Sequence, residues 1–285
     1  ERADWLVGIN ATRLFSCLYG QPLNVGRVMT PTLAMTVSRE VAIDAFQPEP
    51  FYTVLLKMED CMASSERFKD KSQAEALLAE CRKASQAVLQ KTERKEKTKH
   101  PPALYDLTSL QRDANRLLGY SAQQTLDYTQ ALYEKKLVTY PRTDSRYLTE
   151  DMEPGLPDLV RQTAAHFGVT GEIPIHTQQV INSKKVSDHH AILPTRSMAN
   201  ADLSSLPAGE ANVLRLIAAR LLAAVGEPYR YAETTVQMEC AGTVFTAKGK
   251  TALAERWKAV ERAILGNAAE KDKEKLEILP EVQER

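Results

Sequence analysis

The sequence lacks every feature that would assign it to a membrane, secreted or fibrous class. No run approaches the roughly 18 consecutive apolar residues that a membrane-spanning helix needs. Glu1–Leu6 carry acidic residues without the basic opening region of a signal peptide. Only 12 glycines occur in 285 residues, which excludes a collagen-like repeat. The remaining composition, 43% hydrophobic and 26% charged, predicts a soluble globular protein of about two domains.

Cysteine is scarce and scattered. The four cysteines contain no CxxC pair and are Cys17, Cys61, Cys81 and Cys240. Reduced thiols of a cytosolic protein are therefore expected, and neither a disulfide framework nor a zinc site is indicated. A chain of this length can bury a sizeable core without a disulfide or a metal.

An excess of charge of either sign is also missing. Lys and Arg total 37 and Asp and Glu total 37, so the net charge is zero. Bulk charge therefore gives no argument for nucleic-acid binding. It gives none against binding either, because a cleft focuses the local field whatever the total charge.

Helical and β-rich segments alternate along the chain. Apolar spacing predicts a helix that begins at Asp4 and ends at Gly20, and a second helix capped by Thr30. The composition of Phe51–Met58 predicts a strand, and Ser72 begins another helix through a capping box.

A charged run follows a short candidate strand at Ala87–Leu89. Lys91–Lys99 holds five basic and two acidic residues, so the run has a net charge of +3. A solvated connector is the commoner explanation for such a run, although it could also follow a phosphate backbone. Pro101-Pro102 after it marks a domain boundary.

The middle of the chain predicts helices with defined ends. Asp106 starts a helix that stops at Gly119, and Ser121 with Gln124 caps the next one. Leu137–Thr139 then predicts a strand, and this order of elements resembles a winged-helix unit.

A long helix and a hairpin complete the pattern. The helix spans Gly209–Val225, and the hairpin joins Thr235–Cys240 to Thr243–Ala247. Strands before and after a helical block predict a multidomain α+β protein in which a helical domain is inserted into a β-rich one. No internal repeat is present.

The segment around Tyr140 contains the residue types that phosphoryl transfer needs. A phenol ordinarily keeps its proton at neutral pH, so it becomes a nucleophile where a fixed cation stabilises the phenolate and the transition state. Arg142 falls on the same side of an extended strand, and its guanidinium suits phosphate oxygens. Pro141 predicts a strand break that leaves Tyr140 at a mouth. The alternative is a packed strand-end tyrosine, with Asp144 pairing Arg146.

A second candidate cluster is Asp188-His189-His190. It could supply a proton donor or a phosphate contact near neutral pH. Adjacent histidines on a helix point about 100° apart, and no cysteine lies nearby, so a shared metal is disfavoured. The alternative is one buried histidine hydrogen-bonded to Asp188.

Together these segments resemble the motifs of the type IA DNA topoisomerases. Tyr140–Ser145 resembles the active-site tyrosine motif of that family, and Asp188–Thr195 resembles its histidine motif. Asp4–Arg13 and Val25–Leu33 are similar to its helical DNA-binding arm, and all four segments occur in the family's order. The Tyr-Pro-Arg and His-His forms look most like the topoisomerase III branch.

The resemblance implies a role for each matching residue. Tyr140 would attack single-stranded DNA and form a 5′-phosphotyrosyl link, as an isomerase that relaxes or decatenates DNA without ATP. Arg142 and His189 would contact the phosphate near the nucleophile. The residues implied to hold the loop or to contact DNA are Thr143, Asp144, Ser145, Asn10, Arg13 and Arg27.

Two departures limit what the resemblance implies. Met29 stands where the family usually has glutamine. The family's Toprim domain, whose acidic residues bind Mg²⁺, would precede Asp4 and has no counterpart, since the nearest acidic pattern is Asp272-Lys273-Glu274. The resemblance therefore implies a fragment that binds no metal by itself and is inactive alone in multiple turnover.

The implied architecture is part of a toroid, with winged-helix-like helical domains and a β-rich strap. Its hinges would lie near Pro101-Pro102 and Gly226–Pro228. Single-stranded DNA would be the partner, without a membrane, in the cytoplasm on bacterial nucleoid or plasmid DNA. The expected divisions are a helical arm over 1–46, strap halves over 47–104 and 227–262, a helical catalytic domain over 105–226, and a charged return over 263–285.

Two other classes of function remain as alternatives. A non-catalytic winged-helix module would bind duplex DNA in the major groove and would not need Tyr140. A tyrosine recombinase shares the nucleophile but needs arginines and a histidine before a tyrosine near the C-terminus. Tyr140 lies mid-chain with His189 after it, which argues against a recombinase.

Overall fold

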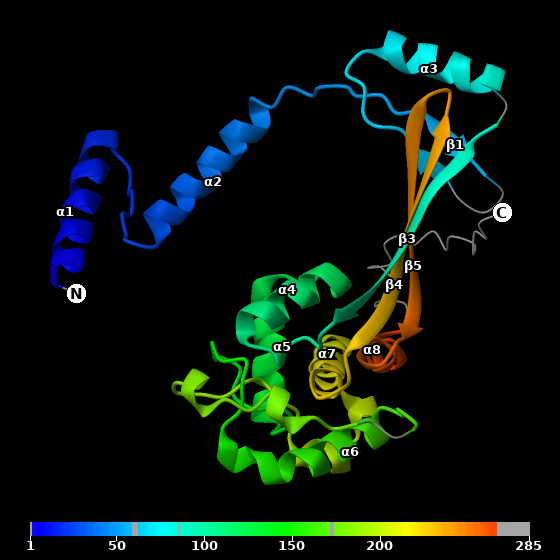
Figure 1. Cartoon of the computed structure of the whole chain (residues 1–285). Helices are drawn as coiled ribbons and strands as arrows, with labels where there is room; N and C mark the ends of the chain where they lie inside the picture. Colours follow the sequence, from blue (N-terminus) through cyan, green and yellow to red (C-terminus); the bar gives the residue numbers. More distant parts are fainter. Residues whose placement is uncertain (1, 59–61, 85, 172–173, 267–285) are drawn as a thin grey trace. The chain divides into compact units, whose positions relative to one another are not determined.

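A computed structural model gives the arrangement of the chain (Figure 1). The structure describes residues 2–58, 62–84, 86–171 and 174–266. It divides into two compact units, the first made of Glu1–Tyr52 with Arg67–Lys71 and the second of Thr53–Glu66 with Ser72–Arg285. Cys61 and most of the expected charged return, including Asp272-Lys273-Glu274, lie outside the described residues.

The first unit contains two helices, α1 (Arg2–Tyr19) and α2 (Met29–Asp44). As predicted, α1 stops before Gly20, which has a positive φ of 64°. The predicted cap of the second helix is wrong, because α2 already begins at Met29. The reason is that the Thr30 amide donates to the Gly26 carbonyl at 3.1 Å and so belongs to the helical turn.

The second unit contains a five-stranded antiparallel sheet in the order β1-β2-β5-β4-β3. The strands are β1 (Leu55–Lys57), β2 (Met62–Ser64), β3 (Val88–Lys99), β4 (Tyr229–Cys240) and β5 (Thr243–Ala254). The predicted hairpin is confirmed and is longer than expected. Its two-residue turn, Ala241-Gly242, has positive φ at both positions, which matches the twist of the flanking strands.

The charged run is not a connector. Lys91–Lys99 forms most of β3 and pairs with β4 from Lys91 opposite Gln237 to Lys99 opposite Tyr229. Lys and Glu have low strand propensity, so composition predicted a loop. Pairing with β4 overrides that propensity because it satisfies the backbone donors and acceptors on one edge of the run.

The strand predicted at Phe51–Met58 is shorter than expected. Only Leu55–Lys57 forms β1, while Tyr52 makes a single antiparallel bridge with Phe68. The helix α3 (Lys71–Ala84) follows, one residue earlier than predicted.

Five α-helices form the remainder of the second unit among the described residues. They are α4 (Leu107–Leu118), α5 (Ala122–Glu134), α6 (Leu156–His166), α7 (Ala208–Ala224) and α8 (Trp257–Leu265). Short 3₁₀ turns connect them at Glu150–Gly155, Thr177–Gln179, Ser183–Lys185, Arg196–Asn200 and Leu203–Ser205. No helix in the described part of the chain is long and apolar enough to cross a membrane.

The predicted helix ends in this block are confirmed. Asp106 and Ser109 form a reciprocal capping box at the start of α4, and Gly119 ends that helix in the left-handed conformation. Ser121 and Gln124 form the same box at the start of α5.

Helix α7 is the centre of the core. On one side Leu214 and Ile217 pack with residues of α4 and α5, and on the other Leu221 and Leu222 pack with residues of α6. A helix that is apolar on nearly all sides is buried in this way. The strand predicted at Leu137–Thr139 is reduced to one bridge, between Val138 and Pro194.

Candidate functional site

The Tyr140 ring lies between two other rings. Its centroid is 4.4 Å from that of His189, at an interplanar angle of 45°. On another side Tyr133 of α5 approaches edge-on, with centroids 5.5 Å apart and an angle of 77°. The structure therefore brings together the tyrosine and the histidine that the two separate sequence segments predicted.

Short backbone contacts hold the tyrosine segment against the histidine segment. The Thr139 amide donates to the Leu193 carbonyl at 2.9 Å, and the Leu193 amide donates back to Thr139 Oγ1 at 2.9 Å. Thr143 Oγ1 donates to the His189 carbonyl at 2.9 Å. These contacts bracket Tyr140 and fix it beside His189.

Thr143 and Ser145 face the interior. Their exposed fractions are 7% and 4%. Thr143 Oγ1 accepts from the Ser145 amide at 3.1 Å, and Ser145 Oγ donates to the Lys185 carbonyl at 2.8 Å. Among the roles that the resemblance implied, this geometry favours positioning of the loop over contact with DNA.

Arg142 and Asp144 are exposed and face outward from the same loop. Arg142 Nη1 donates to Gln130 Oε1 at 3.0 Å, and Asp144 Oδ1 accepts from Ser187 Oγ at 3.2 Å. The alternative pairing of Asp144 with Arg146 is wrong, because Arg146 Nε donates to the Leu104 carbonyl at 3.1 Å. The loop therefore offers a cation at its surface.

The histidine segment is not helical. His189 is exposed, and His190 Nδ1 lies 2.7 Å from the Ala191 carbonyl. The alternative of a buried histidine bonded to Asp188 is therefore wrong for His189, whose ring faces Tyr140 instead. Among the described residues no group of three or more His, Cys, Asp or Glu side chains could hold a metal ion.

The candidate DNA-binding residues of the first unit lie on and beside α1. Asn10 Nδ2 donates to the Leu6 carbonyl at 2.8 Å within the helix. Arg27 Nη1 is 3.5 Å from Asp4 Oδ2, in an ion pair whose arginine side chain is 74% exposed. Arg13 is exposed as well. All three are therefore accessible to a ligand of this unit.

A lysine-rich sheet face is a further candidate that the connector prediction missed. Because side chains alternate across a strand, Lys91, Lys95, Lys97 and Lys99 share one face of β3. The register adds Lys248 and Lys250 of β5 to that face. The acids of β3 and β4 on it are Glu93, which pairs with Lys95, Glu233, which pairs with Lys97, and Glu239, which accepts a hydrogen bond from Gln90. Lysine at four of the five alternate positions from 91 to 99 was the signal that could have identified it.

Sequence comparisons find known proteins that match most of this chain. The sequence profile of a family described as DNA topoisomerase matches residues 1–285. DNA topoisomerase 3 of Bacillus subtilis strain 168 is 43% identical over 272 residues, which cover 90% of this chain and 37% of that protein. DNA topoisomerase 3 of Bacillus cereus strain ZK / E33L is 35% identical over 299 residues, covering 99% and 40%.

A solved structure shares the fold. Full-length topoisomerase I from Thermotoga maritima matches with a TM-score of 0.70 at 22% identity, over 90% of this chain and 43% of that one. The mixed α and β class with an antiparallel sheet is confirmed. The chain spans about two fifths of the length of the curated relatives named above.

Proposed function

Because the chain belongs to the type IA DNA topoisomerase family, we propose that it cleaves and rejoins single-stranded DNA through Tyr140. The observation that carries the proposal is the 4.4 Å contact between the Tyr140 and His189 rings. It joins the two motifs that resemble the family's reacting centre, although 49 positions separate them in the sequence.

The chemistry would be a transesterification. Tyr140 Oη loses its proton and bonds to the phosphorus of a phosphodiester while the bond from phosphorus to the 3′ oxygen breaks. The leaving 3′ oxygen takes up one proton and becomes a hydroxyl, so protons balance. One phosphoester is exchanged for another, so religation by the reverse step needs no ATP. The outcome would be relaxation or decatenation of DNA.

Two side chains would assist that exchange. Arg142 presents an exposed guanidinium two residues from the nucleophile, and a planar donor fork stabilises charge on phosphate oxygens. The His189 ring beside the phenol would hydrogen-bond a phosphate oxygen near the nucleophile. Mg²⁺ belongs to the family's chemistry, but the described residues contain no donor set that fits it, so no step is assigned to a metal.

Binding of the strand would use residues outside this centre. Asn10, Arg13 and Arg27 would contact the backbone of single-stranded DNA, with Asp144 at the loop surface. The lysine-rich sheet face would add attraction to phosphates, which does not depend on base sequence. A cytoplasmic location on bacterial nucleoid or plasmid DNA would follow from such a substrate.

The test is capture of the covalent intermediate. The protein is incubated with an oligonucleotide labelled at the 5′ end or at the 3′ end and is then denatured. Only the 3′ label should stay on the protein, because the fragment downstream of the break has its 5′ phosphate joined to Tyr140. Tyr140→Phe should abolish the adduct, whereas Tyr120→Phe, which loses only a partly buried hydrogen bond from Asn212, should keep it. Adducts that persist in Tyr140→Phe would refute the assignment of the nucleophile.

Fluorescence anisotropy tests the substrate separately. Single strands should bind more tightly than duplex, and the affinity should fall as salt rises, because bound cations release counterions from the backbone. A preference for duplex that is indifferent to Tyr140 would instead favour the alternative of a winged-helix binding module.

A further inference from the structure

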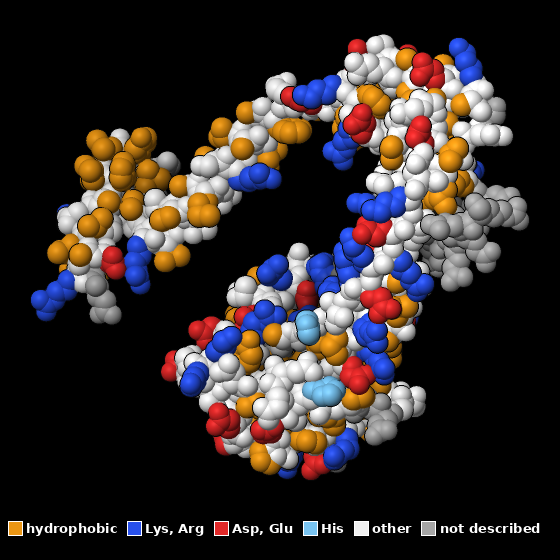
Figure 2. Space-filling view, in the orientation of Figure 1, with side chains coloured by type: hydrophobic (Ala, Val, Ile, Leu, Met, Phe, Trp, Pro, Cys, Tyr) orange, Lys and Arg blue, Asp and Glu red, His pale blue; other side chains and the backbone are white. Residues whose placement is uncertain are grey.

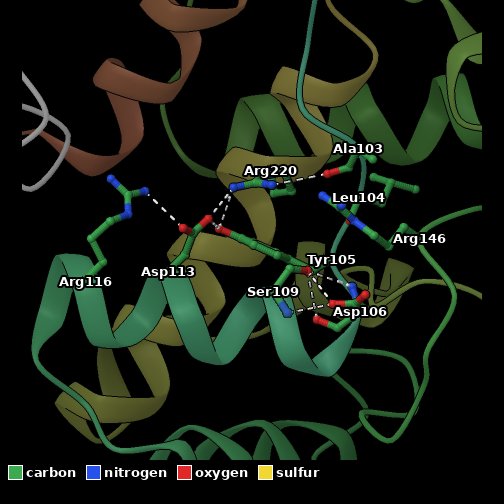
Figure 3. Close-up of polar contacts among 9 residues, drawn as sticks. All are labelled: Ala103, Leu104, Tyr105, Asp106, Ser109, Asp113, Arg116, Arg146 and Arg220. Atoms are coloured by element: carbon green, nitrogen blue, oxygen red, sulfur yellow. Dashed lines mark hydrogen bonds and ion pairs between the residues drawn. The ribbon is translucent and has the colours of Figure 1, made fainter. Parts of the chain in front are cut away.

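A polar network with buried members joins α4, α7 and the segment before α4 (Figure 3). Arg220 of α7 forms an ion pair with Asp113 of α4, and its guanidinium lies 4.0 Å from the centroid of the Tyr105 ring. The Tyr105 hydroxyl donates to Asp113 Oδ2 at 2.8 Å and accepts from Arg220 Nη2 at 3.0 Å. Arg116 supplies a second cation to Asp113 at 3.0 Å. The network therefore ties two helices to the segment that contains Tyr105.

That segment contacts both halves of the candidate site. It spans residues 103–107, from the connection that follows β3 to the first residue of α4. The Ile192 amide, three residues after His189, donates to the Tyr105 carbonyl at 2.8 Å. The Leu107 amide donates to the Thr143 carbonyl at 3.1 Å, three residues after Tyr140. The segment is therefore hydrogen-bonded to both the tyrosine loop and the histidine loop.

Two further bonds make the segment rigid. Arg220 Nη1 donates to the Ala103 carbonyl at 3.2 Å, and Arg146 Nε donates to the Leu104 carbonyl at 3.1 Å. Tyr105 is itself 2% exposed. Side chains from elsewhere in the second unit therefore hold residues 103 and 104 through their carbonyls, and burial holds Tyr105.

The charges of the network are costly to bury and are paired accordingly. The Arg220 side chain is 9% exposed and that of Asp113 is 19% exposed. Burial opposes ionisation of Asp113, but the charge of Arg220 and the bonds from Tyr105 and Arg116 hold the pKa of this carboxyl below its usual value. Apolar side chains of similar size could stabilise such a core equally well. A paired network in this position instead fixes geometry, since its bonds are directional.

We propose that Arg220, Asp113 and Tyr105 are positioning residues for the proposed cleavage reaction. They hold residues 103–107 in place, and this segment in turn sets the distance between the Tyr140 and His189 rings. The inference rests on the proposed function for its effect on catalysis. Its structural half, the restraint of the two loops by the network, can be measured without DNA.

The first measurement is amide hydrogen exchange in the chain without DNA. Tyr105→Phe removes only the hydroxyl and keeps the ring under Arg220, so the fold should persist. Exchange at the Ile192 and Leu107 amides should accelerate about threefold to tenfold, the scale of one hydrogen bond. Amides in the middle of α7 should not change. Unchanged exchange at both loop amides, or equal acceleration throughout the core, would overturn the proposal.

The second measurement is the single-turnover rate of covalent adduct formation in the intact protein. Tyr105→Phe should lower the rate about tenfold or more at saturating DNA. The reason is that a small displacement of the reacting groups from their productive geometry slows the chemical step. The affinity for the single strand should not change. A lowered affinity with an unchanged rate would contradict positioning.

Two more variants keep the result interpretable. Asp113→Asn leaves Arg220 buried without its counter-ion and should slow adduct formation further, with Asp113→Glu restoring part of the rate. Asp158→Asn breaks an exposed ion pair with Arg161 on α6 and should leave both readouts unchanged. Absence of adducts in the unsubstituted protein would refute the proposed function, whereas normal adducts without selective loosening would refute the network's role alone.

Discussion

Both units contain helices with many apolar side chains, but these side chains are exposed in the first unit and buried in the second. In α1 and α2 no residue is buried, whereas α7 buries Leu214, Ile217 and most of its other residues. Trp5 is 65% exposed and Leu33 is 61% exposed, while Leu214 is fully buried. Figure 2 shows the apolar side chains of the first unit on its visible surface. An apolar pattern therefore predicts a helix but does not reveal which residues, if any, cover its apolar face.

The same contrast separates the two groups of candidate site residues. Around Tyr140, buried hydroxyls of Thr143 and Ser145 fix the backbone. In the first unit, Arg27 is held by an exposed ion pair with Asp4. Exposed pairs contribute little to stability because water and salt screen them. Preorganised chemistry is therefore expected in the second unit, and adaptable binding in the first.

Truncation of one leucine in each unit should give the largest difference in stability between the two units. Leu214→Ala should lower the free energy of unfolding by about 2–5 kcal/mol, because it leaves a cavity in α7. Leu33→Ala should change it by less than about 0.5 kcal/mol, because the side chain is exposed. Urea unfolding measures both. Equal losses would mean that α2 buries Leu33 in solution, and the contrast would fail.

Removal of the loop cation should affect chemistry without affecting stability. Arg142→Ala should lower the rate of covalent adduct formation about 100-fold, the scale of one lost transition-state donor. Its stability should be unchanged, because the exposed side chain contacts Gln130 at the surface. Gln130→Ala is the control and should cost far less. A loss of less than about threefold for Arg142→Ala would remove this residue from the reaction.

Loss of a hydroxyl should distinguish buried from exposed threonines. Thr143→Val leaves the Ser145 amide without its acceptor and should cost about 1–3 kcal/mol in unfolding free energy. Thr36→Val removes an exposed hydrogen bond to the Thr32 carbonyl within α2. It should lower the free energy of unfolding by less than about 0.5 kcal/mol. Thermal and urea unfolding measure the pair, and similar costs at both sites would contradict the assigned burial.

Neutralisation of one cation in the first unit should have the smallest effect. Arg27→Gln should flatten the dependence of log affinity on log salt for a single strand by about 0.7, if this arginine contacts one phosphate. Its unfolding free energy should stay within about 0.5 kcal/mol. Arg161→Gln on α6 is the matched control with an exposed ion pair. An unchanged salt slope for Arg27→Gln would remove it from the binding surface.

Structural features that depend on a few neighbouring residues were predicted correctly from the sequence. The caps at Asp106 and Ser121, the stop at Gly119 and the hairpin around Ala241-Gly242 are all confirmed, because capping and turn formation depend on bonds across two to four residues. The motifs around Tyr140 and His189 were also visible, since each is contiguous.

Contacts between distant segments were not predictable in that way. The charged strand β3 exists because β4, more than 120 residues later, supplies its hydrogen-bond partners. Arg220 showed no sign in the sequence of pairing with Asp113, since a lone arginine in an apolar helix has no local partner to reveal it. Composition could predict neither the strand β3 nor the Arg220–Asp113 pair. Contacts between distant segments decide whether a local preference for strand or loop is followed.

The sequence alone was enough to predict the helix ends at Asp106, Gly119 and Ser121 and the turn of the hairpin, because these depend on local backbone geometry. It also pointed to Tyr140 and His189 as candidate site residues, because their motifs are contiguous. The folded chain was needed to show that the Tyr140 ring lies beside the His189 ring, that Thr143 and Ser145 are buried, and that a lysine-rich sheet face forms. Those features require segments far apart in the chain to be brought together. The physical reason is that burial and strand pairing act between segments, whereas propensity and capping act within them.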